Sequence, residues 1–124
     1  MVRMFLNGTA MSGGAAHHLV GGAEPLAATT TAPRYRFWAV DGTAGYPALE
    51  DVGPGGAAVA GELYELDLAH LREVLLPGEP PLLELGVVEL ADGSSSLAMV
   101  LRRGTPATEL TDISALASWR RYTS

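Results

Sequence analysis

The residues best placed to do chemistry form a glycine-rich stretch near the start of the chain, Phe5-Leu6-Asn7-Gly8-Thr9-Ala10-Met11-Ser12-Gly13-Gly14. An apolar strand that ends in a tight glycine turn can expose consecutive main-chain N–H groups, which hold a carboxylate or an oxyanion. Glycines also mark ordinary turns, and more often so. The stretch therefore predicts a turn after a strand, with an anion site as the less frequent use of such a turn.

The histidines form a second candidate group. His17 and His18 are adjacent, and His70 is the only other histidine. Neighbouring residues on a helix point about 100° apart, so the pair does not easily bind one metal ion. The chain has no cysteine to complete a zinc site. We therefore expect no metal site, and we interpret the histidines by default as surface or boundary residues.

Two glutamates are candidate acid–base groups. Glu62 lies on the otherwise apolar face of an expected strand. If that face is buried, the pKa of Glu62 rises and the carboxyl can work as a general acid or base; if the strand is an edge, the carboxylate is solvated. Glu79 lies in a proline- and glycine-rich loop between an expected helix and an expected strand. A carboxylate there is usually solvated, but it can reach over the mouth of a sheet.

The composition excludes several classes of protein. The 124 residues carry a formal charge of -6, and all eight basic residues are arginines. Without lysine the chain cannot be a P-loop NTPase, a pyridoxal enzyme or an amidase-signature hydrolase. The acidic balance argues against nucleic-acid and anionic-membrane partners. No apolar run reaches the ~18 residues of a membrane span, and the N-terminus lacks a secretory pattern. We expect one cytoplasmic domain over residues 1–124, without a cofactor; arginine in place of lysine and abundant alanine suggest a bacterial source.

The elements that position these groups follow from hydrophobic periodicity and from the turn residues. We expect strands over residues 2–6, 26–31, 34–40, 57–66, 82–90 and 97–103. We expect helices over residues 15–20, 68–76 and 114–122, the second of them with Asp67 as its N-cap. The glycines and prolines of residues 41–56 indicate a loop. Strands outnumber helices and several neighbours are joined by turns, so we predict an α+β domain with a mostly antiparallel, barrel-like sheet.

The order of several segments resembles that of gamma-glutamylcyclotransferase-like proteins. These segments are Phe5 to Gly14 followed by His17-His18-Leu19, then Ala32-Pro33-Arg34-Tyr35-Arg36, Gly45-Tyr46-Pro47-Ala48-Leu49 and Val59-Ala60-Gly61-Glu62-Leu63-Tyr64-Glu65-Leu66. The second half resembles one branch of that superfamily, the C-terminal domain of allophanate hydrolase. It does so in Leu82-Leu83-Glu84-Leu85-Gly86-Val87-Val88-Glu89-Leu90-Ala91-Asp92-Gly93, in Thr111-Asp112-Ile113-Ser114 and in Trp119-Arg120-Arg121-Tyr122. The resemblance implies a small mixed β-barrel with short flanking helices and a ligand cavity at its mouth.

The resemblance also implies roles for individual residues. It assigns substrate binding to the turn Asn7, Gly8, Thr9 and Ala10, and it makes Tyr35 and Tyr46, in the next matching segments, candidate substrate-binding residues. In cyclotransferases a glutamate after the following helix is the acid/base, and Glu79 is the nearest positional match. Two departures stand out: Asn7 replaces the tyrosine of the turn, and the Leu-Asp-x-x-Glu-Gly context of the glutamate is absent. Ala10 replaces the turn histidine of the allophanate hydrolase branch, so His18 is the substitute proton donor.

Three functions stay open at this point. The first is a stand-alone homologue of the allophanate hydrolase C-terminal domain that decarboxylates a small carboxylated urea- or amide-type metabolite resembling N-carboxycarbamate. The amidase step would then belong to a separate partner, since the chain has no lysine. The second is a gamma-glutamyl (amine) cyclotransferase that releases 5-oxoproline. The third is a non-catalytic module that binds a metabolite or docks on an enzyme.

Overall fold

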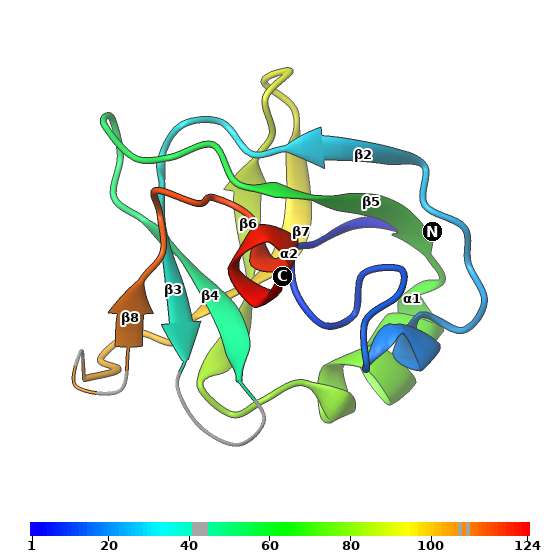
Figure 1. Ribbon diagram of the computed structural model, residues 1–124. Helices are drawn as coiled ribbons and strands as arrows, with labels where there is room; N and C mark the ends of the chain where they lie inside the picture. Colours follow the sequence, from blue (N-terminus) through cyan, green and yellow to red (C-terminus); the bar gives the residue numbers. More distant parts are fainter. Residues whose placement is uncertain (41–44, 107, 109) are drawn as a thin grey trace.

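The computed structural model describes residues 1–40, 45–106, 108 and 110–124, which form two β-sheets and a few short helices (Figure 1). The larger sheet has the order β2-β5-β1-β7-β6, and the smaller sheet has the order β4-β3-β8. The strands are β1 (Val2–Leu6), β2 (Ala27–Thr30), β3 (Tyr35–Val40), β4 (Tyr46–Asp51), β5 (Ala60–Leu66), β6 (Leu83–Glu89), β7 (Ser95–Leu101) and β8 (Leu110–Asp112). Only the β1–β7 pair is parallel, so the predicted α+β class and the mostly antiparallel pairing are confirmed.

The predicted barrel is wrong in one detail, because the described strands do not close into one sheet. Within the described residues, an isolated bridge between Tyr35 and Ala57 links the smaller sheet to the larger one, and an isolated bridge between Thr31 and Leu90 links the two edges of the larger sheet. At the end of β6 the main chain of Glu89 is already occupied: its N–H donates to the Tyr35 hydroxyl and its carbonyl accepts from Ala32 N–H. The bond from Ala32 belongs to the Thr31–Leu90 bridge, so the two edges of the larger sheet meet at this point without forming a continuous ladder.

β4 contradicts the loop that we expected over residues 41–56; of that range, residues 41–44 lie outside the described residues. The strand pairs with β3 over its whole length, with Pro47 opposite Ala39. Proline lacks the N–H needed in the middle of a sheet but is tolerated on an edge strand, and β4 is an edge. The prolines and glycines around it therefore concealed a strand. β8, which we did not predict, is only three residues long.

One of the three predicted helices is present over its expected residues as a mixed helical segment, and the other two are shorter than predicted. Asp67 is the expected N-cap and accepts from Ala69 N–H at 3.3 Å. The helical segment that follows runs through α1 (Leu68–His70), a π-helical turn η2 (Leu71–Leu75) and a 3-10 turn η3 (Leu76–Gly78). The expected helix at residues 15–20 is one 3-10 turn, η1 (His17–Val20), and the C-terminal helix α2 spans Trp119–Thr123, because Ala117 adopts a positive φ of 52° just before it.

The core lies between the larger sheet, the helical segment and the smaller sheet. Its fully buried large side chains include Met4, Phe5, Phe37, Leu49, Val59, Tyr64, Leu71, Leu75, Val88 and Leu90. The helical segment contributes Leu71 and Leu75 to this core, and its end at Gly78 leads directly into β6. The chain between η3 and β6 therefore passes the end of β1. No helix within the described residues is long and apolar enough to cross a membrane.

Candidate functional site

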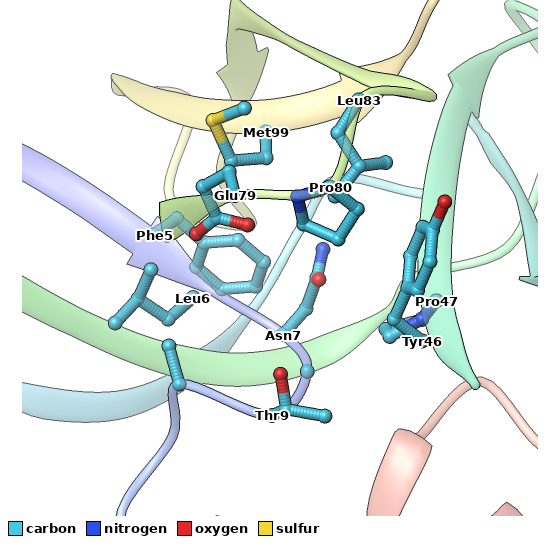
Figure 2. Close-up of a pocket in the computed structure, with 12 residues that line it drawn as sticks. Phe5, Leu6, Asn7, Thr9, Tyr46, Pro47, Glu79, Pro80, Leu83 and Met99 are labelled. Carbon is cyan, nitrogen blue, oxygen red and sulfur yellow. The ribbon is translucent and has the colours of Figure 1, made fainter. Parts of the chain in front are cut away.

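A cavity of about 40 Å³ lies where the turn after β1 meets the start of β4 and the link between η3 and β6 (Figure 2). Its polar lining comes from the turn and from single residues of the other two segments. The lining residues are Phe5, Leu6, Asn7, Gly8, Thr9, Ala10, Tyr46, Pro47, Glu79, Pro80, Leu83 and Met99. A water molecule needs roughly 10–15 Å³ of such space, so the cavity is large enough to admit small polar groups.

The turn presents N–H groups because its carbonyls are already bonded. The carbonyls of Gly8, Thr9 and Ala10 accept, respectively, from Met11 N–H at 3.1 Å, from Ala16 N–H at 2.9 Å and from the His17 ring at 3.0 Å. The C=O and N–H of one peptide unit point in opposite directions, so fixing the Gly8 and Thr9 carbonyls also fixes the N–H groups of Thr9 and Ala10. Within the described residues, the N–H groups of residues 8, 9 and 10 have no acceptor. Main-chain N–H groups without acceptors in such a turn can hold an anion, so the turn is a candidate anion-binding segment.

Two glycines let the turn pack this closely. A Cβ at Gly8 would lie 2.7 Å from both Cδ and Cγ of Pro47, on the wall of the cavity. A Cβ at Gly14 would meet the carbonyl oxygen of Thr9, which is main chain and cannot move aside. Glycine at both positions is thus required by close approach.

Among the described residues, only Glu79 contributes a carboxyl group to the cavity. Its backbone is extended immediately after η3, and its carboxyl lies beside Met99 and Phe5 (Figure 2). Within the described residues it has no hydrogen bond and no ion pair. Burial without compensating donors disfavours the charged form and raises the pKa of Glu79 to about 7. The carboxyl is therefore about half protonated at neutral pH and can donate or accept a proton.

The family model of the allophanate hydrolase C-terminal domain matches residues 2–124. The chain belongs to this family. It is 30% identical to a uropathogenic E. coli-specific protein whose crystal structure superposes with a TM-score of 0.88, covering 98% of this chain and 94% of that chain.

Two further solved structures share the fold of this allophanate hydrolase C-terminal domain. The S177A allophanate hydrolase of Kluyveromyces lactis is 22% identical with a TM-score of 0.89, and the match covers 99% of this chain but only 21% of that enzyme. An AIG2-like protein from Mus musculus is 23% identical with a TM-score of 0.65, over 88% of this chain and 81% of that chain. No curated protein sequence matches the chain.

Eight residues are predicted from the sequence to form the site, and six of them line the cavity. These are Asn7, Gly8, Thr9, Ala10, Tyr46 and Glu79. Figure 2 shows the Asn7 amide between Pro80 and the Phe5 ring, and Tyr46 on the far side of Asn7 from Glu79. The cavity thus combines the turn that the family resemblance implied with the glutamate that it implied.

The other two predicted residues lie elsewhere in this domain. His18 is exposed on η1, and its neighbour His17 is the histidine that contacts the turn. Tyr35 is buried in the core between the sheets, where its hydroxyl accepts from Glu89 N–H at 2.8 Å. Burial raises the pKa of the Tyr35 hydroxyl, with the hydrogen bond from Glu89 acting in the opposite direction. Tyr35 therefore joins the two sheets and does not line the cavity.

Glu62 behaves differently from both possibilities that its strand position suggested. β5 lies between β2 and β1, so it is not an edge, and Glu62 is 6% exposed. Burial alone raises the pKa of this carboxyl, but hydrogen bonds from Ser12, Tyr64 and Arg120 outweigh burial and lower the pKa to about 2. The pKa of Tyr64 rises to about 12, through burial and the bond to Glu62. Glu62 is a fixed anion at neutral pH.

Several lining residues carried no chemical signal in the sequence. Phe5, Leu6, Leu83 and Met99 read only as strand residues, and Pro47 read only as a loop residue. His17 could be found only as one member of the histidine pair. Within the described residues, no group of three histidine, aspartate or glutamate side chains is placed to hold a metal ion.

Proposed function

We propose that the cavity is the active site of a decarboxylase for a small N-carboxylated compound of the N-carboxycarbamate type. The observation that carries the proposal is the pairing of three acceptor-free turn amides with an unpartnered carboxyl whose pKa is about 7. The amides suit a carboxylate, and the carboxyl suits a proton donor that works at neutral pH. The small volume of the cavity favours a compact substrate.

The proposed step breaks one C–N bond. One substrate carboxylate accepts hydrogen bonds from the N–H groups of Gly8, Thr9 and Ala10. The other lies against the apolar wall formed by Phe5 and Met99, where loss of its charge as CO2 is favourable. As the C–N bond breaks, its electron pair stays on nitrogen. The Glu79 carboxyl donates its proton to that nitrogen, and the products are carbamate and CO2. Water then returns a proton to Glu79.

A separate amidase would supply the substrate. The chain has no lysine, so the amidase-signature reaction does not reside in it. It corresponds to about a fifth of the Kluyveromyces lactis allophanate hydrolase, which leaves most of that enzyme without a counterpart here. We therefore place this domain after an amide-hydrolysing partner that releases a dicarboxylated nitrogen.

The test supplies N-carboxycarbamate as it is formed. A catalytic amount of an unrelated allophanate-deaminating amidase generates the compound, and CO2 release is followed with and without the purified domain. The wild-type domain should raise the rate of CO2 release above the spontaneous rate. Glu79→Gln should lose the acceleration by roughly 100-fold or more, the usual contribution of a general acid. Glu73→Gln is the matched control, because Glu73 is 65% exposed and pairs with Arg72 on the same helical segment. A wild-type rate equal to the spontaneous rate would contradict the proposal.

The second candidate is a gamma-glutamyl cyclotransferase. It is favoured by one observation, that Glu79 lies in the same cavity as the turn at residues 7–10. In that reaction Glu79 would take a proton from the attacking amino group and pass it to the leaving amine. Release of 5-oxoproline from gamma-glutamyl amines, lost in Glu79→Gln, would support this candidate over decarboxylation. If neither assay shows turnover and a carboxylate still binds, the domain is a binding module.

A further inference from the structure

We propose that Arg120 on the C-terminal helix is a positioning residue for the anion-binding turn, acting through Ser12 and Glu62. The inference deepens the proposed function and rests on it, since it concerns the same turn. Arg120, Ser12 and Glu62 come from three distant parts of the chain, and Figure 1 shows α2 next to the loop that follows β1. We call these three residues, together with Tyr64, the clamp.

Glu62 is the centre of the clamp and accepts four hydrogen bonds. Its Oε1 accepts from Ser12 N–H at 2.7 Å and from the Tyr64 hydroxyl at 2.9 Å. Its Oε2 accepts from the Ser12 hydroxyl at 2.5 Å and from Arg120 Nη2 at 3.3 Å. Bonds to an ionised acceptor are short and roughly twice as strong as neutral ones. Glu62 thus fixes both the backbone and the side chain of Ser12.

Arg120 completes the hold on Ser12 from the opposite side. The same nitrogen that reaches Glu62 also donates to the Ser12 carbonyl at 2.7 Å and approaches the Ser12 hydroxyl at 3.1 Å. Every polar atom of Ser12 is therefore bonded, and all three contacts of Arg120 end on one nitrogen. A single cationic nitrogen at this place is sufficient to make them.

Two links connect the clamp to the turn amides: the peptide bond between Met11 and Ser12, and the hydrogen bond from Met11 N–H to the Gly8 carbonyl. Ser12 directly follows Met11, whose N–H bonds the Gly8 carbonyl and so helps to fix the orientation of the next amide. A second cavity of about 270 Å³ lies on the α2 side of the turn, lined among others by Gly8, Thr9, Trp119 and Arg120. The Met11 side chain packs into the core, and the hydrogen bonds of the clamp hold the residue that follows it.

A purely structural role would give a different result. If the clamp only joined α2 to the sheet, loss of Arg120 would lower the stability of the whole domain and leave the turn amides unchanged in the folded state. If the clamp positions the turn, loss of Arg120 loosens the turn selectively while the domain is still folded. The two roles are separated by measurements at single amides below the melting temperature.

The first experiment needs no substrate. Amide hydrogen exchange is measured by NMR for the wild type, Arg120→Met and Arg121→Met. Arg121 is the matched control, because it is exposed on the same helix and its side chain has no partner within the described residues. In Arg120→Met, the bonded N–H groups of Met11, Ser12 and Ala16 should exchange about tenfold faster, while core amides of β1 and β5 keep their wild-type rates. Arg120→Lys should restore slow exchange, because one ammonium nitrogen can replace the one guanidinium nitrogen used.

The second experiment uses acetate as the probe of the anion site, followed through the amide shifts of Gly8, Thr9 and Ala10. Arg120→Met should weaken acetate binding about tenfold, within the range usual for coupled sites, and Arg120→Lys should recover most of it. Unchanged exchange at residues 11, 12 and 16, or exchange raised equally throughout the domain, overturns the clamp. A third outcome is possible, in which Arg120→Met speeds exchange only in the turn but the wild type does not bind acetate. This outcome supports the clamp and contradicts the proposed function. The two inferences therefore fail separately.

Discussion

Replacing Glu79 by glutamine should stabilise the domain at pH 8 and leave its stability at pH 4 nearly unchanged. The pKa of Glu79 is about 7 in the folded protein, against an ordinary value of 4.5. Below pH 4.5 the carboxyl is protonated in both the folded and the unfolded chain, so it creates no difference. Between pH 4.5 and 7 the unfolded chain ionises first, and stability falls as the pH rises. Above pH 7 the loss is complete.

The size of the effect follows from the two pKa values. A difference between 4.5 and about 7 corresponds to about 3 kcal/mol, at roughly 1.4 kcal/mol for each pKa unit. Glu79 is only half-buried and opens into the cavity, so we expect about 2 kcal/mol in the measurement. Glutamine has nearly the same shape and stays neutral at every pH. Its free energy of unfolding should therefore not decline across this range.

The assay is urea unfolding of the wild type, Glu79→Gln and Glu73→Gln between pH 4 and pH 8.5. The wild type and Glu73→Gln should lose stability together as the pH rises, and Glu79→Gln should diverge upward from them. Carbon-13 NMR of the labelled glutamate carboxyls should show one group that titrates near pH 7 and disappears in Glu79→Gln. Parallel curves for all three proteins, or a Glu79 carboxyl that titrates near 4.5, would refute the argument from burial.

Three further predictions address the turn and its supports. Gly8→Ala should abolish acetate binding and also lower the melting temperature, because its Cβ would lie 2.7 Å from the rigid Pro47 ring on the cavity wall; binding at wild-type affinity would contradict this. His17→Ala should weaken acetate binding severalfold by releasing a turn carbonyl, whereas His18→Ala, a change at an exposed residue, should not; calorimetry distinguishes them. Glu62→Gln should flatten the loss of stability on acidification. The Glu62 pKa of about 2 lies below the ordinary value of 4.5, so ionised Glu62 stabilises the folded wild type by about 3 kcal/mol above pH 4.5. This stabilisation is lost as the pH falls from 4.5 to 2. An unchanged slope in the acid-unfolding curves of Glu62→Gln would speak against this reasoning.

The sequence predicted the site better where the signal was local. The strand at residues 2–6 and the turn after it follow from an apolar run that ends at Asn7-Gly8, and the structure places both there. Asp67 was recognised as an N-cap because capping depends on a few neighbouring residues. Reliance on local rules also explains why the sequence does not predict β4. A local rule disfavours proline in a strand, and only the order of strands in the sheet shows that Pro47 lies on an edge strand, where proline is tolerated.

Features that depend on distant partners were beyond sequence analysis. The face of Glu62 could be predicted, but the sign of its pKa change depends on Arg120, which lies 58 residues away. The choice between His17 and His18 depends on the rotation of a single 3-10 turn relative to the turn carbonyls. The partners at the end of β6 are distant as well, since Glu89 N–H donates to the Tyr35 hydroxyl of β3 and the Glu89 carbonyl accepts from Ala32 N–H.

The two glutamates of this region acquire opposite chemistry from opposite surroundings. Glu62 is nearly inaccessible to solvent, yet four hydrogen bonds keep it ionised down to a pKa of about 2. Glu79 is less buried, yet without a donor its pKa rises to about 7. Titratable groups whose pKa values are pushed apart in this way divide the work of a site. In the proposed reaction, the fixed anion would hold the turn that binds the substrate carboxylate, and the titrating carboxyl would move the proton. An exchange of the two pKa values would require moving the donors of Ser12 and Arg120 from Glu62 to Glu79, so the fold itself determines which of the two carboxyls titrates near neutral pH.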